Sequence, residues 1–235
     1  GTNHGFMQSL ALLHLSIAFP DLASFSEYQD LALGRLANFL EYYLTDEGVI
    51  LEHSPHYHQY GLRLLADYAR YQALLSRPVE TDFAERYKKA LEFYAVLRRD
   101  DGTLPKIGDT KGPALPTRSV TLDPSGFATR PRRRVPAPVG NGAYVYPASG
   151  FVVWWSGERN DSLESATTPR QLALSWSRFP SLAHKHADDL GLVLWNSDGT
   201  WLTASGYWPY WSPLRQDALS WAASNAPHFV AEPTD

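Results

Sequence analysis

The 235-residue sequence predicts an α+β fold in which helices come first and antiparallel strands follow. Apolar residues recur at helical spacing through about the first hundred residues, and from residue 143 the repeat shortens to that of strands. The segment between these parts is rich in Gly, Pro and Asp, which is typical of loops. We therefore expect helices over residues 1–104, a linker with loops over 105–142 and an antiparallel sheet domain over 143–235.

Four segments with helical periodicity predict helices over residues 4–19, 26–44, 54–75 and 82–99. The third helix has the clearest beginning, because Ser54 suits the N-cap and Pro55 suits the first helical position. Gly48 in "DEG" ends the second helix, since glycine readily adopts the left-handed conformation. The links are short, which favours an antiparallel arrangement of neighbouring helices.

Five segments predict strands over residues 143–155, 170–179, 189–196, 200–208 and 227–232. The sequence "NSDG" at 196–199 separates two of them and is a hairpin turn signal. A hairpin joins antiparallel neighbours, so we expect an antiparallel sheet.

Charge and composition bear on whether the protein binds nucleic acid or sugars. The formal net charge of −4 does not suggest a nucleic-acid binder. The basic segment Arg130–Arg134 is a local exception, for which we expect a solvated loop, with an anion site as the alternative. Aromatic residues make up 13% of the chain, which suits a protein that stacks on sugar rings or one that packs large sheets.

The sequence contains no cysteine and no run of 18 or more apolar residues. Disulfides and thiolate chemistry are therefore excluded, and any zinc ligand must be His, Asp or Glu. We expect no membrane span. The chain opens on "GTNHG" and its only Met is Met7. We expect a piece of a longer protein, in which the lack of a signal peptide says little about export.

The segment "HKHADD" places His184, His186 and Asp188 at alternate positions. Residues two apart on a strand face the same side, so we expect these three side chains on one face. Two imidazoles and a carboxylate could hold a metal or carry out acid–base chemistry. A pair of surface histidines at the entry to a strand is the alternative.

The segment "EHSPHYHQY" at 52–60 gathers three histidines and two tyrosines at the start of a predicted helix. Tyr57 falls in the first helical turn, where the helix dipole would stabilise a phenolate by roughly 0.3–1 kcal/mol. This makes Tyr57 a candidate for proton transfer, and an aromatic contact between helices is the alternative. Asn3 in "TNHG" is either a plain N-cap or an amide that donates hydrogen bonds to a substrate carboxylate.

Seven segments taken in order resemble the heparinase II/III-like family of polysaccharide lyases and related alginate lyases: "NHG", "EHSPHYHQY", "GTLPKIGDT", "SGFVVWW", "HKHADDLGLVLW", "SGYWPY" and "SNAPHF". The resemblance runs through most of the chain. It implies a helical (α/α) toroid followed by stacked antiparallel sheets that form a β-sandwich-like domain. This chain would cover the later toroid helices and the first part of the sheet domain.

The resemblance also implies roles for single residues. Asn3, helped by His4, would neutralise the carboxylate of a uronate. Tyr57 would be the acid, and for one sugar epimer also the base. His184 would be the base for the other epimer.

The resemblance implies a metal site as well, with His186 and His228 as ligands. Ala204 in "TASG" stands where the family carries an Asp. Asp188 or Asp189 could replace that carboxylate, or the site could be empty. We therefore expect that no cofactor is required and that any zinc or other divalent metal is weakly held or absent.

The implied function is a lyase that cleaves a 4-linked, uronate-containing acidic polysaccharide by β-elimination. The partner is the polysaccharide, the expected location is periplasmic or secreted, and the sequence does not indicate an oligomeric state. A glycoside hydrolase on a similar toroid is one alternative, with Glu52, Asp109 and Asp188 as its candidate carboxylates. A non-catalytic protein that binds or exports acidic polysaccharide is the other.

Overall fold

The structure is a computed structural model that describes residues 3–21, 25–114, 117–129, 131–134, 137–157, 168–176 and 184–227. The chain divides into two compact units that interleave along the sequence. The first consists of Gly1–Glu52, His58–Phe93 and Leu115–Pro136. The second consists of His53–Tyr57, Tyr94–Ala114 and Ala137–Asp235. The domain boundaries expected at residues 104 and 142 stay a prediction.

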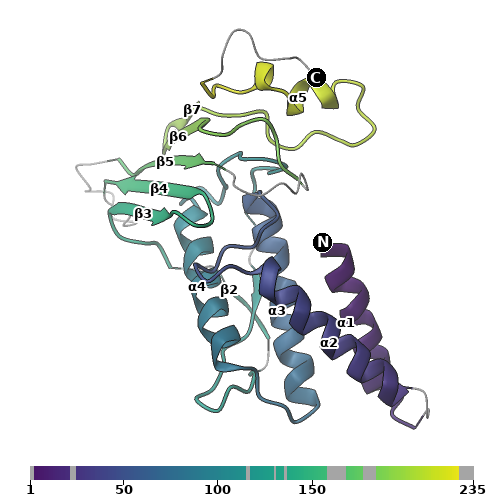
Figure 1. Ribbon diagram of the computed structural model, residues 1–235. Helices are drawn as coiled ribbons and strands as arrows, with labels where there is room; N and C mark the ends of the chain where they lie inside the picture. Colours follow the sequence, from purple (N-terminus) through teal and green to yellow (C-terminus); the bar gives the residue numbers. More distant parts are fainter. Residues whose placement is uncertain are drawn as a thin grey trace. The chain divides into compact units, whose positions relative to one another are not determined.

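The four predicted helices are present and agree with their predicted ranges to within about two residues. They are α1 (Asn3–Ala18), α2 (Phe25–Tyr43), α3 (Pro55–Leu74) and α4 (Thr81–Leu97). In Figure 1, α1 and α2 lie side by side. Among the described residues, no helix has both the length and the apolar character that a membrane crossing requires.

Aromatic side chains form the core of the first unit. Phe6 of α1 lies 5.4 Å from Phe39 and 5.6 Å from Tyr43, measured between ring centroids. The α2–α3 link folds tightly against α4, because Gly48 has a φ of 79° and an added Cβ would lie 2.5 Å from the backbone nitrogen of Ala90. The left-handed conformation predicted for Gly48 is confirmed and only glycine fits there, but α2 already ends at Tyr43 and Gly48 belongs to the turn that follows.

Five antiparallel strands form the sheet of the second unit, in the order β3-β4-β5-β6-β7. They are β3 (Gly142–Tyr146), β4 (Phe151–Ser156), β5 (Arg170–Ser175), β6 (Leu192–Asn196) and β7 (Gly199–Leu202). The helices and this sheet confirm the α+β class. The turn predicted at "NSDG" joins β6 to β7, as Figure 1 shows.

Other predicted boundaries need correction. The single strand predicted over 143–155 is in fact two, β3 and β4, joined by a turn at 147–150. The strand predicted over 170–179 ends at Ser175, the one over 200–208 ends at Leu202, and the one over 189–196 begins only at Leu192. The segment expected to be linker contributes β1 (Thr117–Ser119) and β2 (Arg132–Arg134), which pair with each other in the first unit. The basic segment is therefore partly a strand and not simply a loop. Two short elements were not predicted, namely α5 (Arg215–Leu219) and the 3₁₀ helix η1 (Trp221–Ala223).

The strand predicted over 227–232 lies outside the described residues except for Pro227. The structure describes a single sheet in the second unit, and the stacked, sandwich-like arrangement stays a prediction. The alternation of burial along β4, buried at Phe151 and Val153 and less so at Val152 and Trp154, shows that this sheet has an inner and an outer face.

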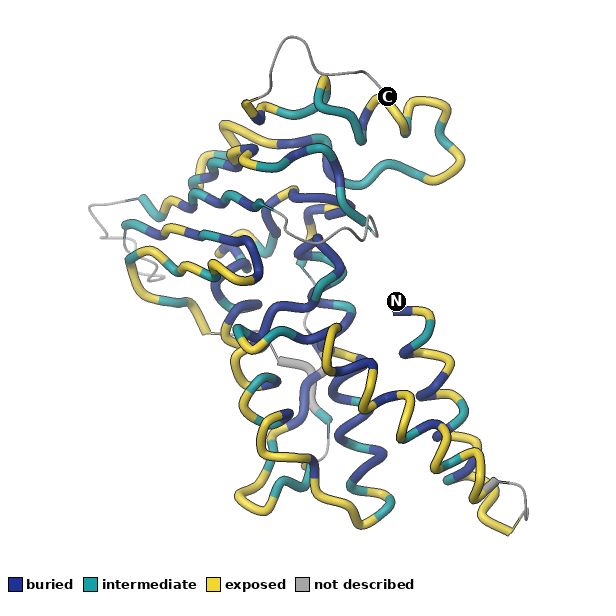
Figure 2. Tube along the Cα trace, viewed as in Figure 1, coloured by how far each residue is buried: buried dark blue, intermediate teal, exposed yellow. Residues whose placement is uncertain are grey.

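One row of side chains crosses the inner face of the sheet. Trp155, Gln171 and Trp195 are direct cross-strand partners on β4, β5 and β6, and all three are buried. Figure 2 shows buried stretches within the strands of this sheet. Both indole N–H groups are satisfied: Trp155 donates to the Val96 carbonyl at 2.8 Å and Trp195 donates to an Asp101 carboxylate oxygen at 2.8 Å. The row thereby joins the sheet to the end of α4 and the loop after it.

Gln171 occupies the centre of the row and has no exposed surface. Its amide nitrogen donates to the carbonyls of Val96 and Leu97 at 3.1 and 3.0 Å. Its oxygen accepts a hydrogen bond from Nε of the buried Arg99 at 2.8 Å. The last carbonyls of a helix have no partner within the helix, so this side chain supplies what the end of α4 lacks.

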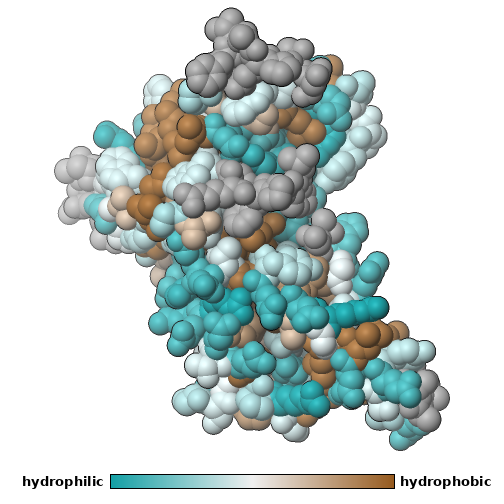
Figure 3. Space-filling model, viewed as in Figure 1, coloured by the Kyte–Doolittle hydropathy of each residue, from teal (hydrophilic) through white to brown (hydrophobic). Residues whose placement is uncertain are grey.

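The outer face of the sheet is also apolar but is less covered by the described residues. Its side chains are half-buried or exposed: Val152, Trp154, Leu172, Leu174, Leu192 and Leu194. Figure 3 shows hydrophobic surface in the part of the molecule that contains this sheet. An apolar sheet face of this kind normally packs against another layer.

We predict that Gln171→Leu destabilises the protein by about 2–3 kcal/mol, because it leaves buried polar groups without partners, each worth about 1–3 kcal/mol. Urea unfolding followed by tryptophan fluorescence measures this, since Trp155 and Trp195 lie in the same row. Gln216→Leu is the matched control, because Gln216 is exposed on α5 and should tolerate the same change. Equal unfolding midpoints for the two variants would contradict the assignment.

Candidate functional site

The turn Gly108–Thr110 forms the centre of the candidate site in the second unit. Gly108 has a φ of 53°, and an added Cβ would lie 2.4 Å from the carbonyl oxygen of His184 and 2.5 Å from that of His53. Only glycine allows this approach of three backbone segments. The next residue, Asp109, then donates its backbone N–H to the His184 carbonyl at 2.9 Å. The "GDT" turn is thus fixed directly against the "HKH" segment.

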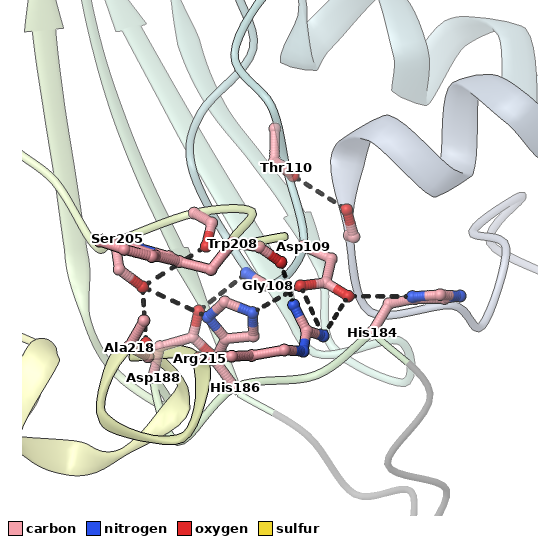
Figure 4. A network of polar contacts seen from close by, with 12 residues as sticks. Gly108, Asp109, Thr110, His184, His186, Asp188, Ser205, Trp208, Arg215 and Ala218 are labelled. Atoms are coloured by element: carbon pink, nitrogen blue, oxygen red, sulfur yellow. Dashed lines mark hydrogen bonds and ion pairs between the residues drawn. The ribbon is translucent and has the colours of Figure 1, made fainter. Parts of the chain in front are cut away.

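The side chain of Asp109 is completely buried, and its shorter hydrogen bonds come from two histidines and an arginine (Figure 4). One oxygen, Oδ2, lies 3.1 Å from Nδ1 of His184, and the other, Oδ1, lies 2.9 Å from Nε2 of His186. Nη2 of Arg215 lies 3.0 Å from Oδ2 and 3.2 Å from Oδ1. A single carboxylate therefore joins two histidines and an arginine.

Electrostatics keeps this carboxyl group ionised. Burial by itself raises the pKa of Asp109, because the charged form loses its hydration. Hydrogen bonds from His184, His186 and Arg215, with the positive charge of the guanidinium, act the other way and outweigh burial. The pKa of Asp109 therefore lies well below its usual range. A carboxylate has no hydrogen to donate, so each partner must supply one.

The structure brings Tyr57 and His184 together, although they are 127 positions apart (184 − 57). Their rings are stacked, with centroids 3.4 Å apart and planes 12° from parallel. Tyr57 lies in the first turn of α3, as predicted, and is half-buried. The hydroxyl of Ser54, just before this helix, lies 2.9 Å from the Thr110 hydroxyl, which fixes the helix start to the turn that carries Asp109.

An aromatic segment lies beside the same carboxylate. The Tyr210 hydroxyl is 3.4 Å from Asp109 Oδ2 and 3.3 Å from His184 Nδ1. The Arg215 guanidinium lies 4.2 Å from the centre of the Tyr210 ring, and its Nη1 donates to the Trp208 carbonyl. The ring of Tyr210 is nevertheless 60% exposed, and the adjacent Trp211 is 85% exposed. Exposed aromatic rings of this kind are available to stack on a sugar.

The prediction that His184, His186 and Asp188 share one face of a strand was wrong. Residues 184–191 form an irregular segment with turns, in which His184 has a φ of 59°. The two histidines still converge, but they do so on the two oxygens of Asp109. Asp188 turns to a different partner and accepts the backbone N–H of Gly108 at 2.8 Å. Burial raises the pKa of Asp188, which fits a structural role.

The residues considered for the metal site have different surroundings in the structure. His186 is buried, with Nε2 on Asp109 and Nδ1 3.5 Å from the Ser205 hydroxyl. Asp189 forms an ion pair with Lys185 at 2.6 Å. Within the described residues, no three His, Asp or Glu side chains are grouped as a metal would require. His228 lies outside the described residues, and Ala204 contributes no ligand atom.

Asn3 and His4 belong to the first unit, and their position relative to Tyr57 and His184 stays a prediction. Asn3 is the first residue of α1, is buried, and donates its backbone N–H to Glu52 Oε1 at 2.7 Å. Its side-chain oxygen has no hydrogen-bond partner among the described residues. His4 is exposed.

His58 shows that the histidines of "EHSPHYHQY" differ in role. It is buried, accepts the backbone N–H of Ile50 at Nδ1 and donates from Nε2 to the Ala90 carbonyl at 2.9 Å. Burial lowers the pKa of His58 to about 4, so the ring is neutral and structural. In the same motif, burial and then the charge of Lys111 lower the pKa of His56.

Sequence reasoning missed the central position of Asp109 and the part played by Arg215 and Tyr210. From the sequence, Asp109 is a candidate only as a carboxylate of a hydrolase. The available signal was the "GDT" turn within "GTLPKIGDT", one of the segments that carry the family resemblance. Arg215 follows "SGYWPYWSPL", an aromatic run that by itself suits either sugar stacking or core packing and gives no sign of a role for the arginine.

Solved structures share the fold of this chain. The heparinase III described as the BT4657 gene product aligns with a TM-score of 0.67 and 13% identity, over 96% of this chain and 36% of its own. A second heparinase III aligns with a TM-score of 0.63 and 17% identity, over 92% and 37%. The heparan sulfate lyase HepC from Pedobacter heparinus aligns with a TM-score of 0.63 and 13% identity, over 93% and 36%. The chain thus spans about a third of the length of these proteins.

No curated protein sequence matches the chain. Residues 1–121, which are more than half of the chain, match the family described as "Heparinase II/III N-terminus". The match covers the four helices, "EHSPHYHQY" and the "GDT" turn, and the similar structures extend over the sheet as well. The chain therefore belongs to the heparinase II/III family.

Proposed function

We propose that this chain carries catalytic residues of a polysaccharide lyase that cleaves a 4-linked, uronate-containing polymer by β-elimination. The observation that carries the proposal is the stacked pair of Tyr57 and His184, two groups able to transfer protons. Membership of the heparinase II/III family supports the same reaction class. A polymeric substrate is met outside the cytoplasm, so a periplasmic or secreted location belongs to the proposal.

The reaction needs three functions from the protein. The carboxylate of the uronate must be neutralised so that the C5 proton becomes acidic, a base must remove that proton, and an acid must protonate the leaving 4-linked oxygen. We assign neutralisation to Asn3 with His4. We assign the acid to Tyr57, which is also the base for one epimer at C5, and the base for the other epimer to His184.

The local geometry suits these roles. Tyr57 lies in the first turn of α3, where the partial positive charge of the helix N-terminus stabilises a phenolate. His184 lies against its ring, so a sugar that reaches one group also reaches the other. The exposed rings of Tyr210 and Trp211 offer apolar surface for neighbouring sugars of the chain.

The hydrolase alternative receives less support. A glycoside hydrolase uses two carboxyl groups that reach the sugar from both sides of the bond. The three carboxyl groups considered for this are all buried: Glu52, Asp109 and Asp188. Asp109 and Asp188 are engaged by protein donors at the centre of the site.

The test is a panel of uronate polymers incubated with the full-length protein and followed by ultraviolet absorbance. Elimination creates a C4–C5 double bond conjugated to the carboxylate, which absorbs, whereas hydrolysis adds water and creates no such bond. Growth of absorbance on any uronate polymer supports the lyase. New reducing ends without absorbance would indicate the hydrolase, and binding without either would indicate the non-catalytic protein.

We predict that Tyr57→Phe in the full-length protein lowers kcat by roughly 10²–10⁴-fold, the usual contribution of a general acid. KM should change little, because the ring and its stacking on His184 are retained. Loss of one half-buried hydroxyl should cost about 0.5–1.5 kcal/mol of stability. Steady-state kinetics and thermal unfolding of the same variant measure both effects.

Tyr60→Phe is the matched control, because it removes the same group from the same helix and should leave kcat near its normal value. Near-normal turnover in Tyr57→Phe would exclude Tyr57 from the mechanism.

We also predict that protein purified without chelator retains well under one zinc per chain. Ala204 removes a carboxylate, and two imidazoles leave tetrahedral zinc short of ligands. Elemental analysis of the full-length protein measures this directly, and Ala204→Asp is the variant expected to raise the zinc content. Stoichiometric zinc in the unaltered protein, lost on His186→Ala, would contradict the prediction.

A further inference from the structure

We propose that Asp109 is a positioning residue that holds the hydrogen of the neutral His184 ring on Nδ1 and so makes Nε2 the nitrogen that takes the substrate proton. This inference rests on the proposed function, in which His184 is the base for one epimer. Asp109 itself touches no substrate, because it has no exposed surface.

The hydrogen position follows from the chemistry of the contact. A neutral imidazole carries one hydrogen, on either Nδ1 or Nε2, and a lone pair on the other nitrogen. Nδ1 of His184 lies 3.1 Å from Asp109 Oδ2, which is an ionised oxygen that can only accept. A lone pair on Nδ1 would face that negative charge and be repelled, whereas a hydrogen there forms a charge-assisted hydrogen bond.

The carboxylate is held so that it cannot turn away from His184. Its second oxygen accepts the Nε2 hydrogen of His186 at 2.9 Å, and Arg215 donates to both oxygens. The Arg215 guanidinium thus supplies a positive charge beside the carboxylate and holds both of its oxygens. The backbone N–H of Asp109 also holds the His184 carbonyl at 2.9 Å, so the two residues are joined at two points.

The hydroxyl of Tyr210 also lies near Nδ1 of His184. It is 3.3 Å from that nitrogen and 3.4 Å from Asp109 Oδ2, both longer than the contact between His184 and Asp109. A hydroxyl that donates to Oδ2 leaves the Nδ1 hydrogen in place. Tyr210 therefore does not compete with Asp109 for control of the ring.

The first measurement needs no change at the carboxylate. Full-length protein labelled with ¹⁵N-histidine gives long-range ¹H–¹⁵N correlations that distinguish a hydrogen on Nδ1 from one on Nε2, and His184→Gln assigns the signal. We expect the Nδ1–H form for neutral His184. The Nε2–H form would overturn the inference even if the protein proves to be a lyase.

The second measurement compares Asp109→Asn with Asp188→Asn. An amide can donate to Nδ1, so Asp109→Asn should move the hydrogen of His184 to Nε2. Turnover should then fall by roughly 10²–10⁴-fold, the contribution of a general base, with KM nearly unchanged. The loss should be larger on polymers of the epimer that uses His184 than on those of the epimer that uses Tyr57.

Asp188→Asn is the matched control. It alters another buried carboxylate, which lies in the same segment as His184 but accepts a hydrogen bond from Gly108. It should keep the Nδ1–H form and most of the turnover. Equal losses in both variants on both epimers, with His184 unchanged, would show that Asp109 acts only through stability. If the unaltered protein forms no unsaturated product from any uronate polymer, the proposed function fails. The ¹H–¹⁵N histidine spectrum still tests, independently of activity, whether Asp109 holds the hydrogen of His184 on Nδ1.

Discussion

The second unit depends on one buried charge, the carboxylate of Asp109. A carboxylate without exposed surface is strongly unfavourable unless it is paired and hydrogen-bonded. Its donors come from positions 75, 77, 101 and 106 residues away, so the fold must assemble several segments to place it. The close backbone approach at Gly108 makes this assembly geometrically possible.

The same carboxylate links stability to the proposed chemistry. The contact that satisfies Asp109 also orients His184, and the His184 ring lies on Tyr57 at the start of α3. Arg215 balances the charge and holds the aromatic segment through Tyr210 and the Trp208 carbonyl. A change at the carboxylate should therefore affect the orientation of the proposed base, the neighbouring aromatic surface and the stability of the unit together.

The sheet supports this arrangement from its inner face. Gln171 and the two tryptophans beside it bind the end of α4 and the loop that follows, and that loop leads directly to the "GDT" turn. Buried polar side chains that are fully paired in this way specify one arrangement, because any shift leaves a donor or acceptor unpaired. The inner row thus fixes the register between the sheet and the segment that carries Asp109.

The sequence by itself determined the order of the elements, the four helices and the hairpin at "NSDG", and it named Tyr57 and His184 as candidates for proton transfer. These follow from local periodicity, from Pro55 and Gly48, and from motifs that resemble a known family. Only the tertiary structure decided that His184 and His186 meet through Asp109 and that Asp188 belongs elsewhere. The expectation that alternate side chains share one face failed there, because residues 184–191 are not a strand. The pairing of a buried carboxylate depends on contacts between distant segments, and local sequence patterns do not encode such contacts.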